Sequence, residues 1–238
     1  MDANLENIVF LDIETVSVQP KYLDLSERIR KQWNRKAKYI HTDELTTPEA
    51  LFEQRAAIYA EFGKVVAIAI GFYHLKEGGT RGFRVKALTN DDEATLLRMF
   101  NDYLGRFNAA TLQLCAHNGK EFDFPYLCRR MLVNGISLPA VLDISGKKPW
   151  EVSLLDTMEM WKFGDWKHYT SLDLLAALFD VPSSKDTMDG SQVGEVYYQE
   201  QDLAKIGKYC AQDVVVTAQV FLKFKGLPLI EKENISIL

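Results

Sequence analysis

The sequence predicts an α/β fold in which helices flank a mixed central β-sheet. Short apolar runs typical of strands alternate with helical patterns along the chain. Two of these runs are separated by a turn signal at residues 77–80, which predicts an antiparallel pair. The 238 residues contain no internal repeat and no linker rich in proline, glycine or serine. We therefore expect a single domain over residues 1–238.

The N-terminal part of the chain predicts a strand, two helices and a second strand. Residues 7–13 form a short apolar run, which is typical of a strand. Residues 25–38 have a helical pattern. A second helix is expected to start at Thr47-Pro48, where a capping residue precedes a proline at the first helical position, and to run to about residue 62. Residues 64–73 are apolar on both faces, which predicts a central strand.

The middle of the chain continues the alternation of strands and helices. Residues 83–87 alternate between apolar and charged side chains, so we expect a strand with one face in solvent. The acidic run at residues 90–93 starts a helix that reaches residue 106. Residues 111–117 predict another strand, and residues 125–133 predict a helix that stops at Asn134-Gly135.

The C-terminal third of the chain is mainly helical. Residues 139–168 show no clear pattern. Helices are expected at residues 170–179, 192–198 and 202–224. The order of elements favours one sheet that has both parallel and antiparallel neighbours.

Composition and charge exclude several classes of protein. The net charge is −5, which argues against a protein that coats nucleic acid, because phosphate binding rests on positive charge. The apolar run at residues 65–73 is too short to cross a bilayer, and the acidic N-terminus does not resemble a secretory signal. Cys115, Cys128 and Cys210 form no C-x-x-C pair, which is typical of reduced thiols. We therefore expect a cytoplasmic protein that does not bind membranes.

Two carboxylates lie two residues apart at the end of the first predicted strand. Asp12 and Glu14 point to the same face, because side chains alternate along a strand. They repel each other unless a cation joins them, and hard divalent cations prefer such oxygen ligands. A solvated pair at a strand end is the alternative. The same spacing recurs at Asp91 and Glu93, where an apparent helix start explains it.

Two later patterns also contain carboxylates. Asp123 follows a predicted strand and directly precedes a helix, so a simple capping role is the alternative to a functional one. Tyr209 and Asp213 lie one turn apart on one face of the last predicted helix. Three valines follow Asp213, so its carboxylate is expected near buried surface. A carboxylate in that position needs a partner, and a metal ion would supply one.

These three patterns read D-x-E, N-x-x-x-F-D-x-P-Y and Y-x-x-x-D, and they occur in that order between Asp12 and Asp213. Together they resemble the exonuclease motifs of the DEDD superfamily, in its tyrosine-bearing branch. The middle motif, from Asn118 to Tyr126, is most similar to that of the proofreading exonuclease domain of family-B DNA polymerases. The whole chain resembles stand-alone bacterial proteins described as predicted 3′–5′ exonucleases related to that domain.

The resemblance implies a ribonuclease H-like fold and hydrolysis of phosphodiesters with two metal ions. It implies that four catalytic carboxylates ligate two divalent ions, Mg²⁺ or Mn²⁺. These are Asp12, Glu14, Asp123 and Asp213. It also implies that Tyr209 orients the attacking water. An unperturbed tyrosine titrates near about 10, so we expect a protonated phenol at neutral pH.

The implied substrate is nucleic acid digested from its 3′ end, with single-stranded DNA favoured over RNA. Thr15, Asn118 and Phe122 would lie beside the terminal nucleotide, and Lys120 is expected to contact a phosphate. Two alternatives are an exoribonuclease of the same superfamily and a catalytically inactive scaffold that binds nucleic acid. We expect no polymerase domain, because few residues follow Asp213.

Two features of the sequence allow more than one interpretation. His168 and Asp173 match the H-x-x-x-x-D pattern of the histidine-bearing branch of the superfamily. However, Thr170-Ser171 resembles a helix start, so His168 is expected to precede the helix, and this assignment would leave Tyr209 unexplained. The cation-rich segment from Arg28 to Lys38 either contacts phosphates or forms a solvated helix.

Overall fold

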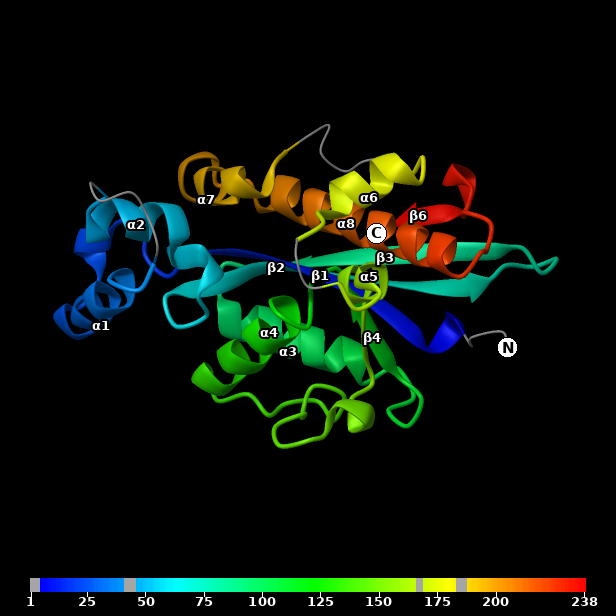
Figure 1. Cartoon of the computed structure of the whole chain (residues 1–238), viewed down its shortest axis with the longest axis horizontal. Helices are drawn as coiled ribbons and strands as arrows, with labels where there is room; N and C mark the ends of the chain where they lie inside the picture. Colours follow the sequence, from blue (N-terminus) through cyan, green and yellow to red (C-terminus); the bar gives the residue numbers. More distant parts are fainter. Residues whose placement is uncertain (1–4, 41–45, 166–168, 183–187) are drawn as a thin grey trace.

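A six-stranded mixed sheet forms the centre of the molecule (Figure 1). The computed structural model describes residues 5–40, 46–165, 169–182 and 188–238. The strands are β1 (Ile8–Ser17), β2 (Gly63–Leu75), β3 (Arg81–Thr89), β4 (Gln113–Ala116), β5 (Leu154–Asp156) and β6 (Ile235–Ile237). Their order is β5-β4-β1-β2-β3-β6. The pairs β1–β2 and β2–β3 are antiparallel and the other pairs are parallel, so the predicted mixed α/β sheet is confirmed.

Helices cover both faces of the sheet, with α8 on one face and α3 and α4 on the other (Figure 1). The helices are α1 (Glu27–Ala37), α2 (Pro48–Arg55), α3 (Glu93–Leu104), α4 (Asp123–Val133), α5 (Thr157–Lys162), α6 (Leu172–Leu178), α7 (Val193–Glu195) and α8 (Leu203–Phe224). Short turns of other helix types include η3 (Ala56–Ile58), η5 (Gly190–Gln192) and the π-helical η6 (Val196–Glu200). Within the described ranges, no helix combines the length and apolar character needed to cross a membrane.

The central strand β1 is buried on both faces, and its alternation decides which helix each side chain meets. Phe10 packs with the cluster that includes α8, whereas Val9 and Leu11 pack with the cluster that includes α3 and α4. The ring of Phe10 meets that of Phe221 of α8 edge to face, with ring centroids 5.4 Å apart. Even-numbered residues of β1 up to Glu14 therefore face α8.

Two glycines allow α8 to approach the sheet closely. A Cβ atom on Gly71 of β2 would lie 2.5 Å from the ring of Phe83 and 2.8 Å from Val214 of α8. A Cβ atom on Gly207 of α8 would lie 2.8 Å from Thr89 of β3. Such distances are too short for a real side chain, so the missing Cβ atoms fix how α8 sits on the sheet.

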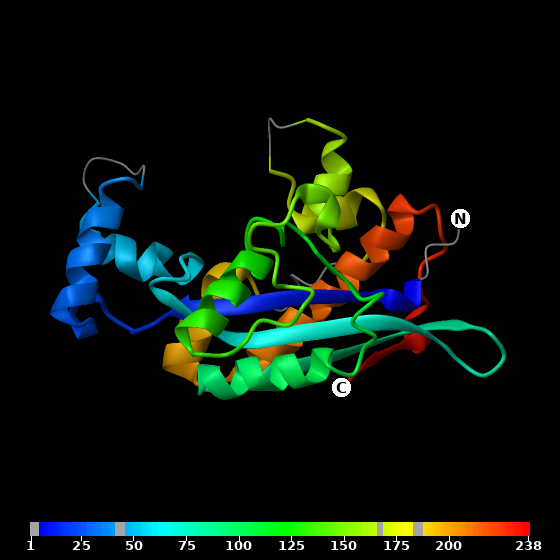
Figure 2. The ribbon, with the colours of Figure 1, turned by 90° about the horizontal axis from the view of Figure 1, so that it is seen from below.

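The helices α1 and α2 form a small lobe that projects beyond one end of the sheet (Figures 1 and 2). The lobe has its own apolar cluster around Trp33, which is fully buried. The indole N–H of Trp33 donates a hydrogen bond to the Pro48 carbonyl at 2.7 Å. The indole also meets Phe52 and Phe62 edge to face. These contacts hold α1 and α2 together as a unit.

Most predicted elements are present, with changed boundaries. The helix expected from Thr47-Pro48 to about residue 62 stops at Arg55 and continues only as η3. The segment at residues 192–198 contains α7 and then a π-helix. The short elements β5, α5 and β6 were not predicted. The single domain over residues 1–238 stays a prediction. Cys115, Cys128 and Cys210 are free thiols.

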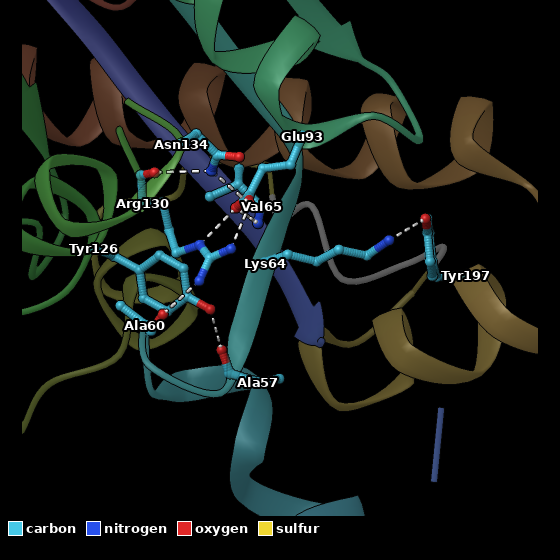
Figure 3. Close-up of polar contacts among 9 residues, drawn as sticks. All are labelled: Ala57, Ala60, Lys64, Val65, Glu93, Tyr126, Arg130, Asn134 and Tyr197. Atoms are coloured by element: carbon cyan, nitrogen blue, oxygen red, sulfur yellow. Dashed lines mark hydrogen bonds and ion pairs between the residues drawn. The ribbon is translucent and has the colours of Figure 1, made fainter. Parts of the chain in front are cut away.

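A buried ion pair ties α4 to the rest of the fold (Figure 3). Arg130 of α4 donates two hydrogen bonds to the Glu93 carboxylate of α3, at 2.9 and 2.6 Å, and a third to the Ala60 carbonyl at 2.9 Å. Glu93 also accepts the Val65 N–H at 2.8 Å and the Asn134 amide at 2.9 Å. Both charged groups are buried, and together the contacts join α4 to α3, to β2 and to the Ala60 carbonyl. The pair therefore sets the position of α4 against the sheet.

The variant Glu93→Gln is expected to lose about 3 kcal/mol of unfolding free energy, because it leaves the Arg130 charge buried with a neutral partner. Urea denaturation at neutral pH measures the loss. The matched control is Glu27→Gln, which removes the exposed Glu27–Lys31 pair and should change stability by about 0.5 kcal/mol or less. Equal effects of the two substitutions would contradict the role given to the buried pair.

Candidate active site

A cavity of about 440 Å³ opens beside the second half of β1. Residues of β1, α4, α6, α8 and the intervening loops line it. Its wall contains the four predicted carboxylates and the predicted tyrosine, namely Asp12, Glu14, Asp123, Asp213 and Tyr209. Three sequence patterns that are far apart along the chain therefore meet in one place.

Asp12 and Glu14 lie on the face of β1 that α8 covers, as the alternation of the strand predicts. Carboxylate oxygens of the two residues lie within 4.8 Å of one another. Among the described residues, the buried Oδ2 atom of Asp12 has no hydrogen-bond partner. A buried carboxylate oxygen without a donor is costly, so this atom is suited to a bound cation.

Asp123 is held against β1 and does not cap its own helix. The residue at the cap position of α4 is Phe122, whose side chain makes no capping hydrogen bond. The Oδ1 atom of Asp123 instead accepts the backbone N–H of Ile13 at 3.1 Å. This bond places the carboxylate next to Asp12 and Glu14. The Asp123 side chain therefore does not have the helix-capping role that the sequence left open.

Tyr209 and Asp213 come to the cavity from one face of α8. The side chain of Tyr209 is buried, and only 6% of its surface is exposed. Burial, the neighbouring carboxylates and a hydrogen bond with Asp213 all raise the pKa of the Tyr209 hydroxyl. The phenol is therefore protonated at neutral pH, as the sequence predicts, and its proton is available for a hydrogen bond.

The carboxylates of the cavity raise one another's pKa values. Burial is the main cause for Asp12 and Glu14, whose pKa values lie well above the usual range, and repulsion from the neighbouring acids adds to it. Burial also raises the pKa of Asp123 to about 7, against the opposing effect of its backbone hydrogen bonds. Each shift favours the neutral acid in the metal-free protein. A bound cation would reverse this preference.

Cys210 lies beside the same carboxylates but is a poor metal ligand. Its thiol donates a hydrogen bond to the Asp12 carbonyl at 3.3 Å. Burial and the nearby acids raise the pKa of the Cys210 thiol well above its usual value. The thiolate that metal binding requires is therefore disfavoured, and the available ligands are carboxylate oxygens.

Two of the four predicted substrate residues, Asn118 and Phe122, line the cavity. The backbone of Asn118 is left-handed, with φ of 60°, and its buried Oδ1 atom has no hydrogen-bond partner within the described chain. An unsatisfied amide oxygen at the cavity wall is suited to bind a ligand donor. The ring of Phe122 packs against Tyr126.

Thr15 and Lys120 lie outside the lining of this cavity. The hydroxyl of Thr15 donates to the Ala57 carbonyl at 2.9 Å. The Lys120 ammonium pairs with Glu159 at 2.5 Å and borders a separate cavity of about 90 Å³. Their roles in substrate binding stay predictions.

Asp156 organises the loop of the second motif, and the sequence interpretation missed it. Its buried carboxylate accepts the backbone N–H groups of Asn118 and Lys120, both at 3.0 Å. It also caps α5 by accepting two N–H groups of the first turn. Asp156 thus fixes the backbone on both sides of Gly119, in the loop that contains the left-handed Asn118. The available signal was a capping residue directly after two leucines, inside a segment that otherwise lacks a pattern.

Other lining residues were also absent from the predicted site. They are Ile13, Ile58, His117, Tyr169, Ser171, Leu172, Asp173, Asp189 and Gly190. The Nε2 atom of His117 lies 2.9 Å from the Thr170 carbonyl, and because a carbonyl only accepts, Nε2 is assigned the hydrogen. Burial lowers the pKa of His117, so the ring is neutral. His168, the rival candidate, lies outside the described residues.

Comparison with known proteins places the chain in a family. Residues 55–229 match the family described as predicted 3′–5′ exonuclease related to the exonuclease domain of PolB. The chain belongs to this family of predicted 3′–5′ exonucleases. The match includes Asp123, Tyr209 and Asp213 but begins after Asp12 and Glu14. Asp12 and Glu14 are linked to the other three residues by the folded structure, in which all five line one cavity. No curated protein matches the chain.

Part of a family B DNA polymerase has the same fold as this chain. The polymerase from the hyperthermophilic archaeon Pyrobaculum calidifontis matches with a TM-score of 0.53 and 17% sequence identity. The alignment covers 91% of this chain and 24% of the polymerase chain, so this chain spans about a quarter of that protein's length. The predicted ribonuclease H-like fold is confirmed by this likeness.

Asp123→Asn is expected to stabilise the metal-free protein by an amount that grows as pH rises from about 4 to about 7 and then levels off. The folded-state pKa of Asp123 is about 7, above its usual value, so over this window the carboxyl ionises in the unfolded chain but stays neutral in the folded wild type. The stability of the wild type therefore falls as pH rises through the window. The asparagine can still accept the Ile13 N–H and does not ionise.

Thermal melts with a chelator measure the effect, which should reach a few degrees in Tm at pH 8. Added Mg²⁺ should remove the advantage of the variant. A difference in Tm that stays constant between pH 5 and pH 8 would contradict the assignment of a buried, charge-crowded Asp123.

Proposed function

We propose that the protein is a metal-dependent 3′–5′ exonuclease that releases nucleotides from the 3′ end of single-stranded DNA. The observation that carries this proposal is the meeting of four carboxylates around one cavity, with a buried Asp12 oxygen that no described group satisfies. Membership of the family of predicted 3′–5′ exonucleases supports the reaction. The family's relation to a polymerase exonuclease domain supports DNA over RNA as the substrate.

The residues of the cavity fit divalent metal ions. Asp12, Glu14, Asp123 and Asp213 offer only oxygen ligands, which suit Mg²⁺ or Mn²⁺. The raised pKa values of Asp12, Glu14 and Asp123 and the repulsion among the carboxylates would be relieved by two such ions. When bound, a pair of divalent ions activates a water molecule and stabilises the negative charge that develops on the phosphate and leaving group.

Tyr209 orients the attacking water in this proposal. Its hydroxyl is protonated, faces the cavity and forms a hydrogen bond with Asp213. A phenol of this kind is a weak base, so its contribution is to fix the direction of approach toward the phosphorus atom. Asp213 in turn holds the hydroxyl in place.

Of the four proposed substrate residues, two lie on the wall of the cavity and two lie outside it. Asn118 would bind the terminal nucleotide through its unsatisfied Oδ1 atom, and Phe122 would contact the sugar or base. Thr15 would act through the η3 turn that it hydrogen-bonds. Lys120 would contact a phosphate only after exchanging its ion pair with Glu159. The free thiols are in keeping with a reducing, cytoplasmic location.

A 5′-labelled oligonucleotide incubated with Mg²⁺ should yield a ladder that shortens from the 3′ end, and a chelator should abolish it. Parallel reactions on single-stranded DNA, duplex DNA and RNA test the substrate, and we expect the fastest release from single-stranded DNA. Cleavage of none of them with any divalent ion would refute the proposal and favour a catalytically inactive scaffold.

Single substitutions assign the roles within the same assay. Asp12→Asn and Tyr209→Phe should each lower kcat by about 100-fold or more, equivalent to about 3 kcal/mol of barrier. The matched control Tyr103→Phe removes a hydroxyl from α3, on the opposite face of the sheet, and should leave kcat unchanged. If His168→Ala removed activity and Tyr209→Phe did not, the tyrosine would not be the residue that orients water.

A further inference from the structure

We propose that the exposed face of α1 is a docking surface for the phosphate backbone of the nucleic-acid strand whose 3′ end occupies the cavity. This inference rests on the proposed exonuclease function and extends it to substrate length. It concerns four cations of the α1–α2 lobe that the sequence could not assign. These cations are Arg28, Lys31, Arg35 and Lys38, here called the α1 stripe.

The α1 stripe lies along one side of the helix. Its members follow one another at intervals of three, four and three residues, a spacing that brings side chains to the same helical face. All four are exposed. The stripe extends about 15 Å along the helix axis at 1.5 Å per residue. The one acidic residue of α1, Glu27, pairs with Lys31 at 2.6 Å. Within the part of the chain that the structure describes, Arg28, Arg35 and Lys38 therefore carry the uncompensated charge of the stripe.

The opposite side of α1 is fixed to the lobe. Trp33 and Ala37 are buried there, and the Trp33 indole is bonded to the Pro48 carbonyl of α2. The N-terminus of α1 is capped by the Ser26 hydroxyl. The cations therefore project from a helix whose position is fixed, so less conformational entropy is lost when they bind a partner.

Both ends of the lobe connect to the candidate active site. On one side, β1 runs from Glu14 to Ser17, about 10 Å, before it enters the lobe. On the other side, Ile58 of η3 lines the cavity itself. The neighbouring Ala57 carbonyl accepts hydrogen bonds from Thr15 of β1 and Tyr126 of α4, at 2.9 and 2.8 Å. A strand that leaves the cavity past Ile58 would therefore meet the η3 turn, which directly follows α2 of the lobe.

The positive charge of the α1 stripe, which contrasts with the negative net charge of the chain, indicates what the stripe binds. The whole chain has a net charge of −5, so a row of cations on one helix is a local feature and does not reflect the overall composition. Lysine and arginine at helical spacing match the repeated phosphates of a nucleic-acid backbone, which carry one negative charge per nucleotide. The partner is therefore the continuing substrate strand, bound through its phosphates without regard to sequence.

The test removes the three uncompensated cations together, as Arg28→Gln, Arg35→Gln and Lys38→Gln. The matched control removes three exposed cations outside the lobe, as Arg84→Gln, Lys225→Gln and Lys232→Gln. Two substrates are compared. One is an oligonucleotide of about 30 nucleotides, and the other is the p-nitrophenyl ester of thymidine 5′-monophosphate, which is too small to extend from the cavity to the α1 stripe. Circular dichroism melts check that both triple variants remain folded.

The α1 variant should have a raised KM for the long oligonucleotide at low salt, with kcat and ester hydrolysis unchanged. Three phosphate contacts on a single strand contribute a slope of about −2 in log affinity against log salt. Between about 50 and 200 mM salt, the wild type should therefore lose about 20-fold more kcat/KM than the variant. The control should behave as the wild type.

Two results would overturn the proposal and leave the function intact. One is an α1 variant with the KM and salt slope of the wild type. The other is an equal change in the control, which would indicate a general effect of charge. If the wild type hydrolyses neither substrate, the proposed function fails instead. In that case fluorescence anisotropy of the labelled oligonucleotide, which needs no cleavage, still compares the α1 variant with the control.

Discussion

Repulsion among carboxylates at the second half of β1 is the constraint on which the rest of the structure depends. Asp12, Glu14 and Asp123 are held close together in a buried place, where burial and mutual repulsion raise their pKa values. Such a cluster opposes folding, so other interactions must hold it. Three features supply that support: the apolar packing on both faces of β1, the close approach of α8 to the sheet at Gly71 and Gly207, and the Glu93–Arg130 pair that holds α4.

The clustering of these carboxylates also changes what can be concluded from the net charge about nucleic-acid binding. A charge of −5 argues against nucleic-acid binding when it is treated as uniform. In the folded protein, several acids are concentrated around one cavity, where divalent ions would offset them, while cations line one face of α1. In our proposals the cavity holds the end of a strand and α1 holds its continuation. The charge still argues against a protein that coats duplexes along their length.

The sequence predicted what depends on local periodicity and missed what depends on tertiary contacts. The common face of Asp12 and Glu14 follows from alternation, and that of Tyr209 and Asp213 follows from helical spacing. The three-residue strands β5 and β6 are too short for a periodic signal, so the cap Asp156 next to β5 stayed hidden. The position of Lys120 could not be predicted, because its ion pair depends on Glu159 in a helix that the sequence did not reveal.

The central claim is that the four carboxylates together bind two divalent metal ions. Electron paramagnetic resonance of Mn²⁺ added to the metal-free, full-length protein, with thymidine 5′-monophosphate present, counts the bound ions directly. The account predicts two Mn²⁺ per chain, displaced by Mg²⁺, with at least one lost in Asp12→Asn. Binding of no Mn²⁺ by the wild type, or equal binding by the wild type and Asp12→Asn, would contradict it.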